Sequence, residues 1–411
     1  MACYRTSLVI FLLTMFSFPA FAQLSSAPLE LPSHDHSCVE IVVAQAIRPV
    51  MEQYRIPGMA VGITMNGEIY IYNYGFASKA TGRPVTNNTL FEIGSISKTF
   101  TATLAAYAQV RGYLSLSDSV SKYLPSLYGS SFDKVSLLNL GTHTSGGLPL
   151  QVPDDVKDTN QLMKYLQCWK PTYTPGSYRT YANPSIGMLG MIAAKSMNME
   201  FATLMVDIIF AGLHMKNTFL DVPKTQIENY AQGYTKTNVP TRMTPGVLAP
   251  EAYGIRSTAG DMVRFIEANM HILDLDQKLQ RAITDTHIGY YQIGAMRQDL
   301  IWEQYCHPVH LRDLLAGNSA KVIFEANPAI RIEPPARPLE DVLINKTGST
   351  NGFGAYVAFI PKMKIGIVLL ANKNYPINAR VTAAYQILTR LSDGLAIIGH
   401  AAPESPLPAT P

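Results

Sequence analysis

Apolar residues recur with helical spacing over residues 39–54, and Ile56-Pro57-Gly58 follows as a stop signal. The next two stretches, 59–65 and 69–74, alternate apolar with smaller or polar residues, which is typical of strands with one buried face. Between them lies Asn66-Gly67, the strongest short signal for a β-hairpin. The pattern therefore predicts that the fold opens with a helix and a hairpin.

A third periodic stretch covers residues 91–111, and Gly112 follows it in the position that commonly ends a helix. Residues 104–110 are apolar around much of the circumference, so this helix is predicted to be buried on several sides. Its first residues read Phe-Glu-Ile-Gly-Ser-Ile-Ser-Lys-Thr-Phe. A buried helix holds its first turn rigidly, which suits a catalytic group.

Helical patterns broken by loops fill residues 117–215, and strand patterns return near the end of the chain. Two of the loops expected in the helical part are residues 146–151 and 181–184. Farther on we predict a helix at 257–270, a loop at 328–338 because of Pro334 and Pro335, strands at 343–348, 355–360 and 365–371, and a closing helix at 378–391.

Strands at both ends of the chain and helices in the middle predict an α/β fold of the α+β kind. One antiparallel sheet is built from both chain ends and flanked by helices, with an all-helical lobe inserted. We assign residues 1–22 to a signal peptide, 23–395 to the domain (sheet region about 27–90 and 230–395, helical region about 91–229) and 396–411 to a disordered tail. Ligand sites tend to form where two such parts meet, so we expect the active site at the junction.

The first 22 residues have the features of a secretory signal peptide. Arg5 is their only charge, residues 8–18 are apolar, and Ala20-Phe21-Ala22 forms a cleavage site before Gln23. The apolar run is short for a membrane span, although an uncleaved anchor is the alternative. We therefore predict a periplasmic protein with no membrane attachment after cleavage.

Charge gives no indication of a nucleic-acid or strongly acidic partner, because 33 Lys and Arg residues face 30 Asp and Glu residues. Without Cys3 of the signal peptide, Cys38, Cys168 and Cys306 remain. Their odd number and wide spacing favour buried free thiols, with a single disulfide as the alternative. His34, Asp35 and His36 lie together, but no H-x-x-x-H or H-E-x-x-H motif occurs, so we expect no metal site.

Ser95 and Lys98 are three residues apart at the start of the helix predicted for 91–111. That spacing stacks a hydroxyl and an amine on one helix face. A helix start also offers unsatisfied backbone N–H groups and the positive end of the dipole, which stabilise the oxyanion formed when a serine attacks a carbonyl. The alternative is an ordinary capping serine beside a solvated lysine.

Two further segments favour a catalytic role for Ser95 and Lys98 over the capping alternative. Tyr181-Ala182-Asn183 and Lys346-Thr347-Gly348-Ser349 follow Ser95-x-x-Lys98 in the order that marks serine β-lactamases and penicillin-binding proteins, with Tyr-Ala-Asn in place of S-D-N. A serine hydroxyl needs a positioned base to act as a nucleophile at neutral pH. Either Lys98 or Tyr181 can take its proton if neighbouring cations such as Lys346 lower the pKa of that group. The two titrations are coupled, and the sequence leaves their assignment open.

The chain resembles a class C β-lactamase, the cephalosporinase type of serine β-lactamase, from its first helix to its last. The segments that carry the resemblance are 90–100, 146–153, 181–187 and 346–361, followed by Ala371-Asn372, Tyr375-Pro376 and Ala379-Arg380. The resemblance implies an α/β sheet region with an all-helical region, and no cofactor. It also implies hydrolysis of cephalosporins and penicillins through an acyl-enzyme on Ser95, and hence antibiotic resistance. Small-molecule β-lactam substrates and inhibitors are the expected partners of a monomer.

Individual roles are also implied by this resemblance. The backbone N–H groups of Ser95 and Ser349 form the oxyanion hole, and Tyr181 acts with Lys98. The residues expected to bind substrate are Gln151 and Asn183 at the amide side chain, Lys346, Thr347, Ser349 and Asn374 at the carboxylate, Tyr253 in the side-chain pocket, and Arg380. Gly348 is also expected to bind substrate, by letting it approach the strand backbone closely; a sheet bulge at Gly348 is compatible with the same role. Alternatives remain for two of the others: Arg380 as a solvated or salt-bridged side chain, and Tyr253 as a packing residue.

The chain departs from the family pattern at three positions. Ile377 stands where many members carry an Asn, so affinity at the carboxylate end is in doubt. Asn345 stands where His is frequent, and His143 where Tyr is common. No Glu-x-x-Leu-Asn motif of the class A kind occurs, so deacylation is assigned to Tyr181 with Lys98.

Two other functions compete with the lactamase. A penicillin-binding DD-peptidase or a serine esterase has the same constellation but releases its β-lactam acyl group slowly. A catalytically idle binding protein on the same scaffold is disfavoured, because Ser95, Lys98, Tyr181 and Lys346 are all intact.

Overall fold

The computed structural model describes residues 36–400, and side chains are described up to residue 393. The proposed signal peptide and residues 401–411 lie outside the described residues. The proposed tail from residue 396 begins within the last helix, which extends to His400. Within residues 36–400, no helix combines the length and apolar character that crossing a membrane requires.

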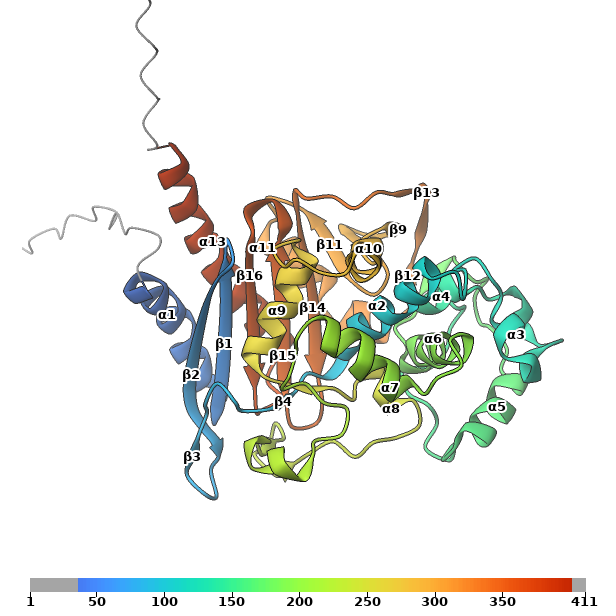
Figure 1. Ribbon diagram of the computed structural model, residues 1–411, viewed down its shortest axis with the longest axis horizontal. Coiled ribbons are helices and arrows are strands. Elements are labelled where there is room, and N and C mark those ends of the chain that lie inside the picture. The colour runs from blue at the N-terminus through green and yellow to red at the C-terminus, as the bar shows by residue number, and fades with distance from the viewer. Residues whose placement is uncertain (1–35, 401–411) are drawn as a thin grey trace, which may run out of the picture.

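A large antiparallel sheet, assembled from both ends of the chain, forms the centre of the molecule (Figure 1). Its strands follow the order β13-β9-β10-β11-β14-β15-β16-β1-β2-β3. Their bounds are β1 Gly58–Met65, β2 Glu68–Ser78, β3 Arg83–Pro84, β9 Gly289–Ile293, β10 Met296–Gln298, β11 Glu303–Cys306, β13 Ile330–Ala336, β14 Val342–Ser349, β15 Gly354–Ile360 and β16 Ile365–Ala371. The predicted sheet built from both chain ends is confirmed.

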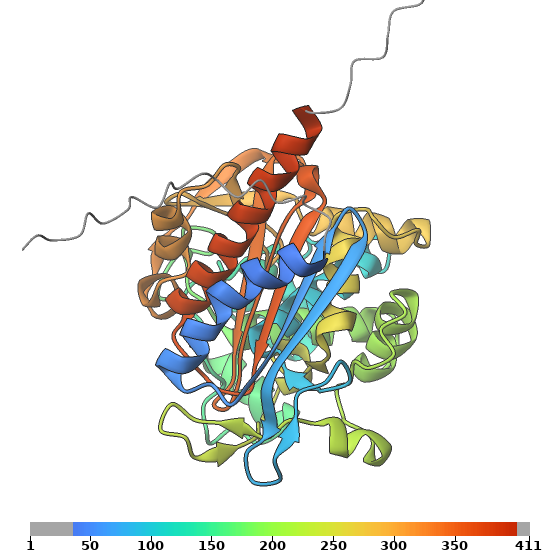
Figure 2. The ribbon, with the colours of Figure 1, turned by 90° about the vertical axis from the view of Figure 1, so that its left-hand side faces the viewer.

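Helices cover both faces of this sheet. Figure 2 shows α1 (His36–Tyr54) and α13 (Ile377–His400) side by side across one face. On the other face, α9 (Ala259–Asn269) packs on β1 and β16. Every residue of β1, β15 and β16 is buried, because these central strands have helices on both sides.

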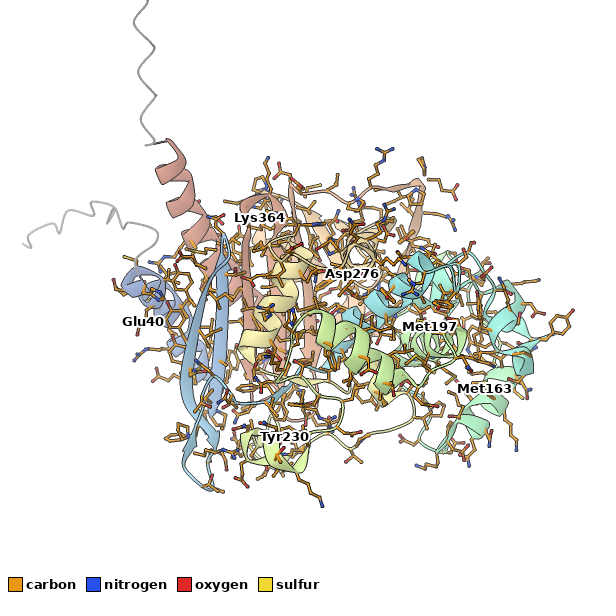
Figure 3. The ribbon with its side chains drawn as sticks, in the orientation of Figure 1. Glu40, Met163, Met197, Tyr230, Asp276 and Lys364 are labelled. Carbon is orange, nitrogen blue, oxygen red and sulfur yellow. The ribbon has the colours of Figure 1, made fainter. Side chains whose placement is uncertain are left out.

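The middle of the chain is mostly helical, and its helices lie to one side of the sheet in Figure 1. In Figure 3, Met163 and Met197 lie in this part, whereas Glu40 lies on α1 and Lys364 lies just before β16 of the sheet. The remaining helices are α2 Ser97–Val110, α3 Val120–Tyr123, α4 Leu137–Gly141, α5 Thr159–Cys168, α6 Asn183–Ser196, α7 Phe201–Leu204, α8 Ala249–Ala252, α10 Gln277–Asp285, α11 Leu311–Gly317 and α12 Ala320–Phe324. The short strands are β4 Phe91–Glu92, β5 Tyr178–Arg179, β6 Gly233–Tyr234, β7 Pro240–Thr241, β8 Arg256–Ser257 and β12 Asn327–Pro328.

The opening hairpin is confirmed in detail. Met65 pairs with Glu68, so Asn66 and Gly67 form a two-residue loop, and both have positive φ, at 52° and 89°. This is the backbone that a primed hairpin turn requires. The predicted strands near the C-terminal end, and helices α9 and α13, are also found. β16 has the predicted bounds, and the bounds of the others are shifted by a few residues or extended.

The helix expected over residues 91–111 is shorter. Phe91 and Glu92 form β4, which pairs with β8, and Gly94 has a φ of +54°. An α-helix cannot include a left-handed residue, so a 3₁₀ turn over Gly94–Ile96 precedes α2. Gly112, with a φ of +77°, follows the helix as predicted.

Three other predictions were wrong. Residues 328–338 are not all loop, because β13 forms the edge of the sheet. Its pairing with β9 is irregular between Arg331 and Ala336, so Pro334 and Pro335, which have no backbone N–H, are tolerated there. Asn183 belongs to α6 instead of a loop, with Pro184 in the first turn, where its missing N–H costs nothing. The three cysteines are free, but only Cys38 is buried, whereas Cys168 and Cys306 are exposed.

Candidate active site

Ser95 and Lys98 meet at the start of α2, as their spacing predicted. The Lys98 ammonium donates a 2.9 Å hydrogen bond to Ser95 Oγ and a 2.8 Å bond to the Ala252 carbonyl. Lys98 has no solvent exposure, so the alternative of a solvated lysine is wrong, and Ser95 caps neither the 3₁₀ turn nor α2. Burial is the main cause that lowers the pKa of Lys98, and the positive charge of Lys346 lowers it further.

Tyr181 comes from the segment between β5 and α6 and lies beside this pair. The ammonium groups of Lys98 and Lys346 lie 5.2 and 5.3 Å from the centroid of its ring. Burial by itself raises the pKa of the Tyr181 phenol. The charges of Lys98 and Lys346 and a hydrogen bond with Ser95 outweigh that effect, so the pKa is lowered.

Lys346 on β14 is held by a carboxylate that sequence reasoning missed. Glu303 on the neighbouring strand β11 accepts a 3.3 Å bond from Lys346 and a 3.0 Å bond from Arg179. All three side chains are almost completely buried. Two buried cations therefore share one carboxylate, which leaves a net positive charge beside Tyr181.

The start of α2 approaches the end of β14 closely, and two glycines make this approach sterically feasible. A Cβ at Gly94 would lie 2.5 Å from the backbone nitrogen of Ser349, and a Cβ at Gly348 would lie 1.9 Å from the carbonyl oxygen of Ile93. The backbones around Ser95 and Ser349 are thereby adjacent. The pairing of β14 with β15 continues in register through Ser349, so the alternative of a bulge at Gly348 is wrong.

Gln151 and Asn183 are also brought together, although they lie 32 positions apart in the chain. Asn183 Nδ2 donates a 2.8 Å bond to Gln151 Oε1, while Asn183 Oδ1 is buried without a partner among the described residues. Gln151 is exposed, so its amide can reach a ligand. Tyr253 directly follows α8, next to the carbonyl that binds Lys98, and is partly buried.

Arg380 lies beneath the end of β14 and is completely buried, which overturns the alternative of a solvated side chain. It donates bonds to the carbonyl of Gly348 at 2.6 Å, to Ser349 Oγ at 2.9 Å and to Asn374 Oδ1 at 3.2 Å. Burial lowers the pKa of Arg380 to about 10. Its guanidinium therefore holds two of the predicted carboxylate-binding residues, Ser349 and Asn374.

A cavity of about 270 Å³ opens beside Tyr181, between the loop at Gly147–Leu150 and the segment Ile323–Ala326. A larger cavity of about 440 Å³ lies against α5 and contains none of the predicted site residues. The smaller cavity is the relevant one, because Tyr181, whose pKa is lowered, is part of its lining. Among residues 36–400, no three His, Cys, Asp or Glu side chains gather closely enough to hold a metal ion.

Several residues of this cluster could not be identified from sequence patterns. Arg179 lies two positions before Tyr181, but nothing in that spacing marks it. Glu303 belongs to no motif, and Ala252 contributes only its backbone carbonyl. His143, noted above only as a departure from the family pattern, packs against the Tyr181 ring. Only strand pairing and loop packing bring these residues to the site.

Comparisons with known proteins identify the family of the chain. The sequence profile of the β-lactamase family matches residues 43–391. The chain is 52% identical to a β-lactamase of Lysobacter lactamgenus over 368 residues, covering 90% of this chain and 95% of the relative. It is 44% identical to a β-lactamase of Escherichia coli K12, covering 85% and 93%.

Solved structures are similar over the same extent. A class C β-lactamase in complex with cefoxitin has a TM-score of 0.85 at 52% identity, covering 87% of this chain and 99% of that one. A D-alanine carboxypeptidase of Burkholderia cenocepacia has a TM-score of 0.84 at 52% identity, covering 87% and 100%. The chain therefore belongs to the β-lactamase family, within its class C of serine hydrolases.

Proposed function

We propose that this protein hydrolyses the amide bond of cephalosporins and penicillins through a covalent acyl-enzyme on Ser95. The observation that carries the proposal is the contact of Ser95 Oγ with Lys98 Nζ at 2.9 Å, beside a Tyr181 whose pKa is lowered. A hydroxyl with a base in reach and a second titratable group beside it is the arrangement of an activated nucleophile. The cefoxitin complex of a 52% identical class C enzyme supports the choice of substrate.

In acylation, Ser95 Oγ attacks the β-lactam carbonyl carbon while its proton passes to the Lys98–Tyr181 pair. The carbon–nitrogen bond of the ring then breaks, and the same proton is delivered to the leaving nitrogen. Because the two groups titrate together, the pair acts as one base and one acid. The negative charge on the carbonyl oxygen is stabilised by the backbone N–H groups of Ser95 and Ser349, each worth about 3–4 kcal/mol.

Substrate is held along β14 and by the loop opposite. We assign the substrate carboxylate to Lys346, Thr347, Ser349 and Asn374, with Arg380 behind them. We assign the amide side chain to Gln151 and Asn183, with Tyr253 as one wall of its pocket. We also assign to Gly348 a close approach of the β-lactam to the strand backbone, while the space of its missing side chain is taken up by the Ile93 carbonyl.

In deacylation, a water attacks the ester carbonyl, and Tyr181 with Lys98 takes its proton. The water proton then returns to Ser95 Oγ as the carbon–oxygen bond breaks. The lowered pKa values of Lys98 and Tyr181 support this role, since a base works best when its pKa lies near the working pH. The protein would then confer β-lactam resistance as an exported, periplasmic monomer.

The alternative, a DD-peptidase, is kept because a D-alanine carboxypeptidase is among the 52% identical structures. A pre-steady-state time course with a chromogenic cephalosporin on the protein from Gln23 onward distinguishes the two. Sustained turnover over many equivalents, lost in Ser95→Ala, is expected for the lactamase. One stoichiometric burst followed by a stall would instead identify a penicillin-binding enzyme, and turnover retained by a folded Ser95→Ala variant would refute the assignment.

A further inference from the structure

His143 lies directly against Tyr181, yet the chemistry above gives it no role. It follows α4 and has a φ of +57° and an exposed fraction of 1%. Its ring centroid lies 4.4 Å from that of Tyr181, at an interplanar angle of 45°. A non-glycine residue held in the left-handed region costs conformational energy, so the surrounding contacts must keep it there.

Those contacts are hydrogen bonds between His143 and the residues immediately before and after Tyr181. The carbonyl oxygen of His143 accepts a 2.8 Å bond from the N–H of Thr180, and its Nδ1 accepts a 3.3 Å bond from the N–H of Ala182. One residue therefore holds both peptide groups that flank the phenol. An accepting Nδ1 carries no proton, so a neutral ring bears its proton on Nε2, which has no partner among the described residues.

The electrostatic surroundings favour that neutral form. The positive groups nearby are Arg179 on β5, Lys98 on α2 and Lys346 on β14, and the carboxylate of Glu303 on β11 already pairs with two of them. Burial first, and then the charges of Arg179, Lys98 and Lys346, hold the pKa of His143 well below its usual value. A protonated ring would also point an Nδ1–H at the N–H of Ala182.

We propose that His143 is a positioning residue, which fixes the Tyr181 phenol against Ser95 and Lys98 by holding the N–H groups of Thr180 and Ala182 and packing on the ring. This inference rests on the proposed function, because it assumes that Tyr181 is part of the base. It adds a residue whose acceptor atom, and not its charge, matters for catalysis.

A matched pair of variants tests the role of the acceptor. His143→Phe keeps an aromatic ring but loses Nδ1, whereas His143→Asn keeps an acceptor oxygen and tolerates the left-handed backbone. We expect kcat for a cephalosporin to fall on the order of tenfold to a hundredfold in the Phe variant, with KM nearly unchanged, and to stay within about threefold in the Asn variant. Equal rates in the Phe variant and the unaltered protein, or equal losses in both variants, would overturn the proposal.

Histidine NMR measures the protonation state of the His143 ring directly, and this test does not require the His143→Phe variant to fold. In ¹⁵N-histidine-labelled protein, the His143 signals are those that disappear in His143→Asn. We expect them to report a neutral ring protonated on Nε2 from about pH 8 to about pH 5. A proton on Nδ1, or titration near the ordinary value of about 6.5, would overturn the proposal.

Mass spectrometry of the β-lactam adduct on Ser95 separates this proposal from the proposed function. If the unaltered protein neither turns over a cephalosporin nor forms an adduct on Ser95, the proposed function fails, whatever the NMR result. If it forms the adduct and turns over, and the two variants behave alike, only the role of His143 is refuted.

Discussion

Lys98 and Arg380 are both cations without solvent exposure, but their surroundings differ in kind. Lys98 donates hydrogen bonds to the Ser95 hydroxyl and the Ala252 carbonyl. Both Lys98 and a second cation, Lys346, lie beside the ring of Tyr181. Arg380 bonds to backbone carbonyls and two polar side chains around the end of β14. The first region holds an unbalanced charge next to atoms that can exchange protons. The second is a network of hydrogen bonds around one guanidinium, in which only Arg380 Nε lacks a partner among the described residues.

This difference indicates that the region around Lys98 carries out the reaction, whereas the region around Arg380 stabilises the structure that binds substrate. Burial, and then the charge of Lys346, lowers the pKa of Lys98; the charges of Lys98 and Lys346 outweigh burial and lower the pKa of Tyr181, which brings a base toward the working pH. Around Arg380 the guanidinium satisfies carbonyls that would otherwise be buried without partners. Substitutions in the first region should therefore change rates, and substitutions in the second should change stability and substrate affinity.

The largest expected effect in this comparison is that of Tyr181→Phe. Losing the phenol oxygen removes half of the coupled pair, so kcat should fall by about 10²–10⁴ while the fold persists. Steady-state kinetics with a cephalosporin, together with thermal unfolding, measure both quantities. Tyr128→Phe, at an exposed position, is the control, and an unchanged rate in Tyr181→Phe would leave Lys98 as the sole base.

Arg380→Ala should act mainly on stability. It leaves the carbonyls of Gly348 and Tyr375 without their donor, so the free energy of unfolding should fall by about 3 kcal/mol. Arg390→Ala is the control on the same helix. The exposed Arg390 bonds only to Gln45 among the described residues, so its loss should cost about 0.5 kcal/mol or less. Denaturant unfolding tests the pair. An equal loss of unfolding free energy in both variants would show that Arg380 does not stabilise the end of β14.

Lys346→Gln tests the electrostatic part of the comparison. The charge of Lys346 lowers the pKa of Lys98 and Tyr181, so without it both pKa values rise. Activity requires the deprotonated pair, so the acid limb of the kcat/KM profile should move to higher pH, with about a tenfold loss at neutral pH. Lys362→Gln, which removes an exposed ion pair with Asp341, should leave the limb in place. An acid limb that stays put in Lys346→Gln would contradict the electrostatic account.

The smallest effect is expected for Ile377→Asn at the start of α13. Asn can offer a hydrogen bond at the carboxylate end of the site where Ile cannot, so KM for a cephalosporin should fall about threefold with little change in kcat. Ile377→Leu keeps the apolar character and should leave KM unchanged. A KM that does not respond to Asn would show that substrate does not reach this position.

Local patterns predicted much of this molecule, because they depend on neighbours within a few residues. The Asn66-Gly67 turn specifies its hairpin by itself, and the three-residue spacing of Ser95 and Lys98 places both on one face even though α2 begins later than expected. The edge strand at Ile330–Ala336 was missed because it depends on its position in the sheet and not on its neighbours in the chain. Its prolines argue against a strand anywhere except at an irregular sheet edge, and the sequence does not say which strand forms the edge.

The sequence by itself determined the order of the elements, the three motifs and the family resemblance. Only the tertiary structure decided that Glu303 joins Lys346 to Arg179, that His143 brackets Tyr181, and that Arg380 is buried. These contacts join residues far apart in the chain, and strand register and loop packing bring them together. A pKa in such a cluster follows from burial and from charges a few ångströms away, which no spacing along the chain encodes.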